Sequence, residues 1–61
     1  MTAKQFIKLL KADGWYFVRQ EGSHKQFRHL VRTGRVTVSD HGGKNIAPGT
    51  LDNMRKQAGW K

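Results

Sequence analysis

Residues 15–40, WYFVRQEGSHKQFRHLVRTGRVTVSD, decide the fold of this 61-residue chain. Three segments rich in aromatic and β-branched residues, at 15–20, 24–31 and 35–40, are separated by the short breaks EGS and RTG. Each break contains a glycine, which adopts positive φ at low cost and so fits a tight turn. The stretch therefore predicts three consecutive antiparallel strands joined as a meander.

The residue pattern assigns a buried and an exposed face to the second and third strands, but not to the first. In the third segment two valines alternate with polar residues, which is typical of a sheet with one buried and one solvent-exposed face. In the second segment, if Phe27 faces the core, residues an odd number of positions away from it point to the open face, because side chains alternate along a strand. The open face then carries His24, Gln26 and Arg28, while Lys25 and His29 share the side of Phe27. The first segment is apolar on both faces at 15–18, so its register stays undecided.

Helical patterns flank the predicted strands on both sides. The first helix has Thr2 as N-cap and Gln5 three residues later, which is the pattern of a capping box, and it ends at Gly14. A second helix starts near Pro48, a residue that suits the first helical turn. The sequence predicts a single α+β domain over 1–61, with the order α-β-β-β-α. A three-stranded antiparallel sheet is covered by both helices on one face and is open on the other.

The chain is strongly basic, with 12 Lys and Arg against 4 Asp and Glu and a formal net charge of +8. This excess on one small domain favours a nucleic-acid binder. The alternatives are a soluble basic protein, a membrane-surface binder and a protein with an acidic partner. Lysines at 4, 8 and 11 form a stripe on the first helix, which fits phosphate contact and a solvated helix face equally well.

Composition also indicates the compartment. The chain contains no cysteine, which excludes disulfides and thiolate metal sites and suits a reducing environment. No apolar run approaches the roughly 20 residues that span a bilayer, and lysines interrupt the apolar stretches of the first helix, unlike a signal peptide. We therefore expect a cytoplasmic protein without membrane association.

Several kinds of active site find no support in the motifs. GGKN at 42–45 lacks the glycine spacing and the Ser or Thr of a phosphate loop, and no dinucleotide fingerprint is present. His24 and His29 are five residues apart on one strand and so point to opposite faces, which argues against a metal site. Ser23 and His24 are adjacent on an extended chain and cannot easily face each other as a hydrolase pair. We expect neither a metal nor another cofactor.

His24 on an open basic face fits phosphodiester chemistry. RNA carries its own nucleophile, the 2′-OH, so its cleavage needs a base, an acid and cations around the phosphate. Imidazole accepts and donates protons near neutral pH. The residues that would stabilise the phosphate charge are Lys25, Arg28 and Lys44. A single histidine in a turn is often inert, however, so the residues alone leave a catalytic and a structural role open.

Three further residues are candidates for structural roles, and two of them have a second interpretation. Gly22 supplies the turn geometry that brings His24 out of the strand, and Ser23 either bonds nearby backbone or orients His24 and contacts phosphate. Trp60 either makes an exposed contact or packs against the first helix. We predict substrate binding by Gly22, Ser23, Lys25, Arg28 and Lys44.

Nearly the whole chain resembles the HicA family of small mRNA interferase toxins. The resemblance rests on a helix ending in LLKADGW, on Arg19 followed by GSH, and on the strand motif VTV. It continues through the loop and helix start HGGKNIAPGTL to RKQAG. The combination of GSH with PGTL at this distance is specific.

The resemblance implies a fold similar to double-stranded RNA-binding domains and a metal-independent endoribonuclease whose catalytic histidine is His24. It also implies a HicB-type antitoxin that covers this histidine and represses the shared operon. We expect a monomeric free toxin, a hetero-oligomer with the antitoxin, and an unpaired RNA substrate. The alternatives are a non-catalytic RNA-binding module with the same fold and an interaction domain for an acidic protein.

Overall fold

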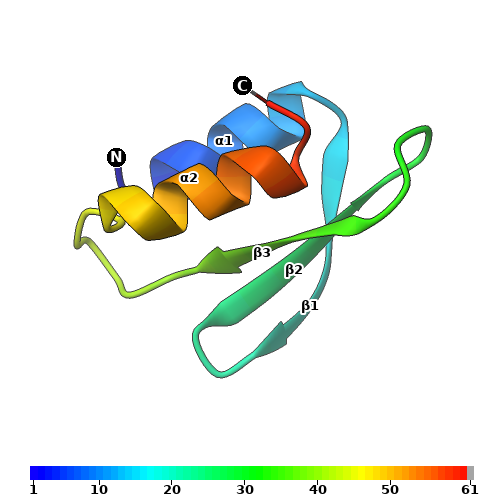
Figure 1. Cartoon of the computed structure of the whole chain (residues 1–61). Coiled ribbons are helices and arrows are strands. Elements are labelled where there is room, and N and C mark those ends of the chain that lie inside the picture. The colour runs from blue at the N-terminus through cyan, green and yellow to red at the C-terminus, as the bar shows by residue number, and fades with distance from the viewer. Residues whose placement is uncertain (61) are drawn as a thin grey trace.

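The computed structural model describes residues 1–60. Its elements follow the order α1 (Ala3–Ala12), β1 (Trp15–Glu21), β2 (His24–His29), β3 (Arg35–Ser39) and α2 (Pro48–Gln57). The strands pair antiparallel in the order β1-β2-β3, and both helices lie on the same side of the sheet (Figure 1). The predicted α-β-β-β-α order and the α+β fold of the double-stranded RNA-binding type are confirmed. Neither helix has the length and apolar character needed to cross a membrane.

The start of α1 follows directly from local sequence. The Thr2 hydroxyl accepts a hydrogen bond from the Gln5 backbone N–H at 3.3 Å, and the Gln5 side chain accepts one from the Thr2 N–H at 2.9 Å. The predicted capping box is thus present, and it satisfies two donors that a helix start leaves free. The buried residues of α1, Ala3, Phe6 and Leu10, form the apolar stripe that packs into the core.

The core lies between the sheet and the two helices. Its buried residues are Ala3, Phe6, Leu10, Trp15, Phe27, Val36, Val38, Met54 and Ala58. Phe27 on the central strand is 1% exposed, and Phe6 on α1 packs against Trp60 with the ring centroids 5.2 Å apart. Of the two interpretations of Trp60, packing against the first helix is confirmed.

The C-terminal end of α1 is held by the carboxylate of Asp13. One of its oxygens, Oδ2, accepts hydrogen bonds from Nε1 of Trp60 at 3.0 Å and from Nε1 of Trp15 at 3.2 Å. The guanidinium of Arg32 lies 3.8 Å from the same oxygen. The hydrogen bond from Trp60, then that from Trp15 and the Arg32 charge, hold the pKa of Asp13 below its ordinary value. One carboxylate therefore connects α1, β1, the β2–β3 loop and the end of the chain.

Replacing Asp13 by Asn is expected to lower the melting temperature by a few degrees at pH 7, because the indoles and Arg32 lose a charged acceptor. Since folding depresses the pKa of Asp13, the stabilisation is complete above the ordinary value of 3.8 and is lost as the pH falls through the folded-state pKa. Thermal unfolding between pH 7 and pH 2 should therefore show the two proteins converging in acid.

Asp52→Asn is the matched control for this experiment. Asp52 pairs with Lys56 at 3.2 Å on the exposed surface of α2, where ion pairs contribute little. The Asp52→Asn protein should have a melting temperature close to that of wild type over the whole range from pH 7 to pH 2. An Asp13→Asn difference that persists unchanged at pH 2 would contradict a role for the charge.

The first strand contains the one irregularity in the register of the sheet. Phe17 pairs with Phe27, but the next pair is Arg19 with Gln26, so Val18 has no partner and forms a β-bulge. The bulge reverses the alternation, because Trp15 and Phe17 lie on the helix side whereas Arg19 lies on the open side. This decides the register that the apolar run left open.

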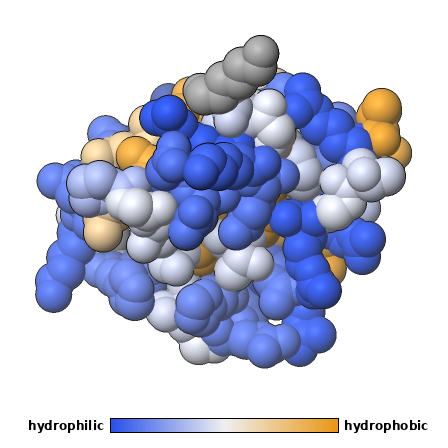
Figure 2. Space-filling model, viewed as in Figure 1, coloured by the Kyte–Doolittle hydropathy of each residue, from blue (hydrophilic) through white to orange (hydrophobic). Residues whose placement is uncertain are grey.

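The surface agrees with the basic, polar composition. In the space-filling view most of the visible face is hydrophilic, and the β2–β3 loop is one of the places where apolar residues show (Figure 2). Leu30 and Val31 of this loop are 88% and 85% exposed. The backbone around them is nevertheless anchored, since Nδ1 of His29 accepts hydrogen bonds from the N–H groups of Val31 and Arg32.

Candidate functional site

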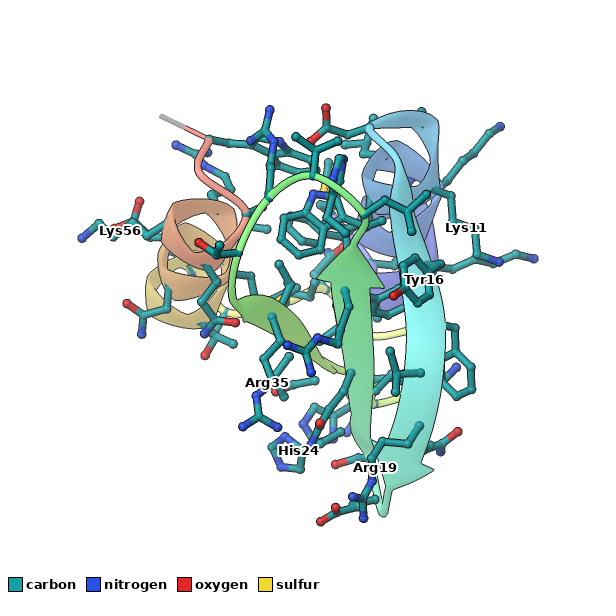
Figure 3. All side chains as sticks on the ribbon, turned by 90° about the vertical axis from the view of Figure 1, so that its right-hand side faces the viewer. Lys11, Tyr16, Arg19, His24, Arg35 and Lys56 are labelled. Carbon is teal, nitrogen blue, oxygen red and sulfur yellow. The ribbon has the colours of Figure 1, made fainter. Side chains whose placement is uncertain are left out.

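The open face of the sheet is a basic surface. The strand registers place nine side chains there: Tyr16, Arg19, Glu21, His24, Gln26, Arg28, Arg35, Thr37 and Ser39. Figure 3 looks onto this face, and its labelled side chains of Tyr16, Arg19, His24 and Arg35 project from it. The set contains three arginines and one glutamate, so this face attracts polyanions.

His24 stands at one end of this face. It is the first residue of β2, directly after the turn at Gly22 and Ser23, and its cross-strand neighbours are Glu21 on β1 and Ser39 on β3. The side chain is exposed, and within residues 1–60 it makes no hydrogen bond or ion pair. The imidazole is therefore free to contact a ligand, as the alternation around Phe27 predicted.

The turn before His24 is built by its two neighbours. Gly22 has φ +57°, and its carbonyl accepts a hydrogen bond from the Gln20 side chain at 2.8 Å. The Ser23 carbonyl accepts the Asp40 N–H at 2.7 Å, which ties the turn to the end of β3. The turn geometry assigned to Gly22 is confirmed. Substrate contacts by Gly22 and Ser23 stay predictions.

Two arginines that the sequence analysis did not predict as site residues lie on the open face together with His24. Arg19 reaches this face through the bulge at Val18 and forms an ion pair with Glu21. Arg35 donates a hydrogen bond to the Gln26 side chain at 3.1 Å. Arg35 was recognisable from the alternation in β3. Arg19 was not, because a bulge leaves no pattern in an apolar strand.

Arg28 lies on the predicted face, at a distance from His24. It is four residues further along β2, or about 13 Å at the ordinary rise of a strand. Its cross-strand neighbours are Tyr16 and Arg35. A polyanion that reached His24 would therefore meet the charge of Arg28 at a neighbouring phosphate.

Lys25 lies on the other face of the sheet from His24. Its ammonium group is 2.7 Å from the Asp40 carboxylate. The hydrogen bond from Lys25 and the Gly42 N–H hold the pKa of Asp40 below its ordinary value, and the charges of Lys25 and His41 contribute less. The structure does not bring Lys25 together with His24, and a phosphate contact by Lys25 stays a prediction.

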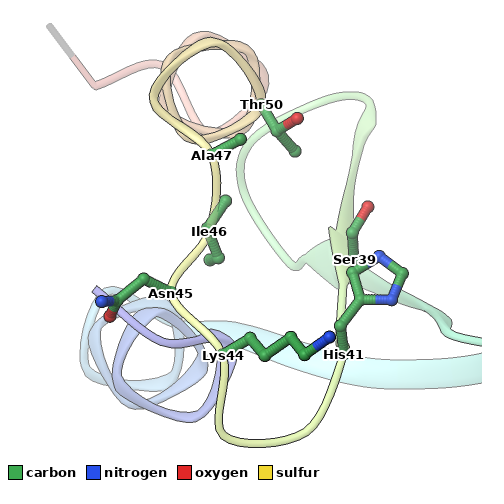
Figure 4. A pocket seen from close by; sticks show the side chains of 7 residues that line it. All are labelled: Ser39, His41, Lys44, Asn45, Ile46, Ala47 and Thr50. Carbon is green, nitrogen blue, oxygen red and sulfur yellow. The ribbon is translucent and has the colours of Figure 1, made fainter.

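A hollow of about 390 Å³ lies between the end of β3 and the start of α2, at the end of the sheet that carries His24. Seven residues line it: Ser39, His41, Lys44, Asn45, Ile46, Ala47 and Thr50. In Figure 4 the Lys44 side chain extends across the hollow toward His41, and Ile46 and Ala47 line the opposite wall. Lys44 thus lies near the end of the sheet that carries His24, because Ser39 pairs with His24 and borders the hollow.

His29 has a structural role. Its Nδ1 accepts two backbone N–H groups, and its Nε2 donates to the Asp13 carbonyl at 2.7 Å, which fixes the ring proton on Nε2. The ring also packs edge-on against Trp15, with the centroids 5.2 Å apart. Gly14 has φ +97°, and a Cβ there would lie 2.6 Å from Nε2, so the ring fills all the space beside it.

The described part of the chain, residues 1–60, contains no group of three His, Asp or Glu side chains placed to hold a metal ion. His24 and His29 occupy opposite faces of β2, as their spacing predicted.

Residues 3–60 match the family model described as "HicA toxin of bacterial toxin-antitoxin". The chain belongs to the HicA toxin family. The match covers both helices and all three strands, and it confirms the resemblance seen in the sequence. A comparison with curated proteins gives no match. Membership in a family of toxin–antitoxin toxins implies an antitoxin partner for this HicA protein.

Proposed function

We propose that this HicA protein is a metal-independent endoribonuclease, an mRNA interferase, that acts as the toxin of a type II toxin–antitoxin module in the cytoplasm. The observation that carries the proposal is the exposed His24 at the end of an open basic face. A histidine without a protein partner can exchange protons with a substrate. The arginines around it attract a phosphodiester backbone without selecting a sequence.

The reaction needs few groups from the protein. The 2′-oxygen of the RNA attacks the adjacent phosphorus, and the bond from phosphorus to the 5′-oxygen breaks. His24 acts as the base that takes the 2′-OH proton or as the acid that protonates the 5′-oxygen. The products are a 2′,3′-cyclic phosphate and a 5′-OH, so no water, metal or cofactor is consumed in this step.

The cations of the surface have distinct places in this proposal. Lys44 stabilises the phosphate nearest His24, and Arg28 binds a neighbouring phosphate further along β2. Gly22 and Ser23 hold His24 at the turn and offer backbone and hydroxyl groups to the substrate. Lys25 reaches RNA only if a substrate contacts the edge near Asp40. Unpaired RNA suits the site, because attack in line with the leaving oxygen needs a flexible strand.

The partner in this proposal is a HicB-type antitoxin. A net charge of +8 on the toxin favours an antitoxin surface that is acidic where it covers His24. Covering this residue would block access of RNA to the site. We propose a monomeric free toxin and a hetero-oligomer with the antitoxin.

Incubation of the purified protein with a long unstructured RNA in EDTA tests the proposal. We expect cleavage products that carry 2′,3′-cyclic phosphates, and inhibition by a stoichiometric amount of the protein encoded by the adjacent open reading frame. RNA binding measured in parallel separates the two functional classes. Binding without any cleavage would replace the proposal with a non-catalytic RNA-binding module.

A further inference from the structure

The hollow at the His24 end of the sheet is lined by a second histidine, which the proposed reaction has not used. His41 and Lys44 both line it, together with the hydroxyl-bearing residues Ser39 and Thr50. The Lys44 side chain points toward His41 across the hollow (Figure 4). A group that transfers protons and a fixed positive charge thus share one small space with hydroxyl groups and an apolar wall.

The strand register brings His41 to the same end of the sheet as His24. Ser39 is the cross-strand partner of His24, and paired residues of antiparallel strands have Cα atoms about 5 Å apart. His41 follows two residues after Ser39, while the residue between them, Asp40, turns to the other side and pairs with Lys25. The hollow that contains His41 therefore lies at the same end of the sheet as His24, along the edge strand β3.

Cleavage of RNA needs two proton transfers at atoms on opposite sides of the phosphorus. One group removes the proton of the 2′-OH, and another supplies a proton to the departing 5′-oxygen. His24 is one proton-transfer group. The nearest carboxylates already have partners, since Glu21 pairs with Arg19 and Asp40 pairs with Lys25.

We propose that His41 is the second proton-transfer residue of the cleavage reaction, acting on a phosphate that Lys44 binds in the hollow. The inference rests on the proposed ribonuclease function and adds a catalytic residue to it. In this arrangement one histidine takes the 2′-OH proton while the other gives a proton to the 5′-oxygen. The proton count balances, because the histidine that acts as the base ends the step protonated and the histidine that acts as the acid ends it neutral. The apolar wall at Ile46 and Ala47 accommodates the sugar or base of the same nucleotide.

The experiment compares single-turnover cleavage of an unstructured RNA by wild type and four variants, His41→Ala, Lys44→Ala, Lys56→Ala and Glu21→Gln, between pH 5 and pH 9 in EDTA. His41 is exposed, so its loss should leave the fold intact, which a thermal melt checks. We expect wild type to show a bell-shaped profile. His41→Ala should be slowed by about 100-fold or more at saturating RNA and should lose one limb of the bell.

Two lysine variants separate binding from proton transfer. Lys44→Ala should weaken RNA binding and slow cleavage, yet keep both limbs of the profile. Lys56→Ala is the matched lysine control, since Lys56 pairs with Asp52 on α2 away from His24 (Figure 3). Its cleavage rate should equal that of wild type.

Two results would overturn the role of His41 while leaving the ribonuclease proposal intact. One is a His41→Ala protein that cuts at the wild-type rate, or only binds RNA more weakly, with both limbs retained. The other is loss of a limb in Glu21→Gln in place of His41→Ala. If wild-type protein itself fails to cut, the proposed function fails first.

Discussion

His24→Ala is expected to slow RNA cleavage by at least about 100-fold, the usual contribution of a proton-transfer group, while RNA affinity stays within about threefold. The reason is that the imidazole contacts the substrate in the proposed mechanism, whereas within residues 1–60 it makes no hydrogen bond or ion pair that its loss would remove. The arginines that attract the backbone remain in place. Single-turnover kinetics in EDTA and a fluorescence binding titration measure the two quantities.

His29→Ala is the matched control, because it removes the same side chain from the other face of the same strand. His29 anchors the β2–β3 loop and packs on Trp15, so its loss should lower the melting temperature. Cleavage per folded molecule should be retained. His24→Ala should show the reverse, with stability within about 0.5 kcal/mol of wild type. A His24→Ala protein that still cuts at the wild-type rate would remove His24 from the mechanism.

Phe27→Ala is expected to unfold most of the protein at 37 °C. Phe27 is 1% exposed at the centre of the sheet, and truncation of a buried phenylalanine costs about 3–5 kcal/mol. A chain of this length has a total stability of roughly 3–9 kcal/mol, at 0.05–0.15 kcal/mol per residue. The loss therefore consumes most of the available stability. Urea unfolding followed by tryptophan fluorescence measures it.

Phe17→Ala tests the same residue type directly across the strand pair. Phe17 is the cross-strand partner of Phe27, and their rings meet edge-on at 5.8 Å, yet Phe17 is 49% exposed. Its truncation should cost less than about 1.5 kcal/mol, the upper range for such an aromatic pair. Equal losses in the two variants would show that the core extends over Phe17.

The predicted part of the site depended on one strand with a clear alternation. A buried Phe27 fixed the faces of its neighbours, so His24 and Arg28 were assigned correctly to the open face and His29 to the other. The same rule placed Lys25 opposite His24, although we expected it to help stabilise the phosphate. Its ion pair with Asp40 was not predictable, because that partner lies far along the chain, in the loop directly after β3.

The sequence by itself determined what depends on neighbours along the chain. The capping box at Thr2 and Gln5, the glycine turns and the alternation in β2 and β3 involve residues a few positions apart, so their patterns are readable and specify the element order. The family resemblance rests on the same local motifs. The position of His24 on an open face also follows from them.

Tertiary structure alone decided what depends on contacts between distant segments. The bulge at Val18 brings Arg19 to the open face, because a one-residue shift in a strand reverses every side chain after it. The hollow with His41 and Lys44 forms only when the start of α2 packs near the end of β3. The Asp13 carboxylate likewise meets Trp60 across 47 residues of chain. No periodicity records such contacts, since they arise from how the packed elements share the core.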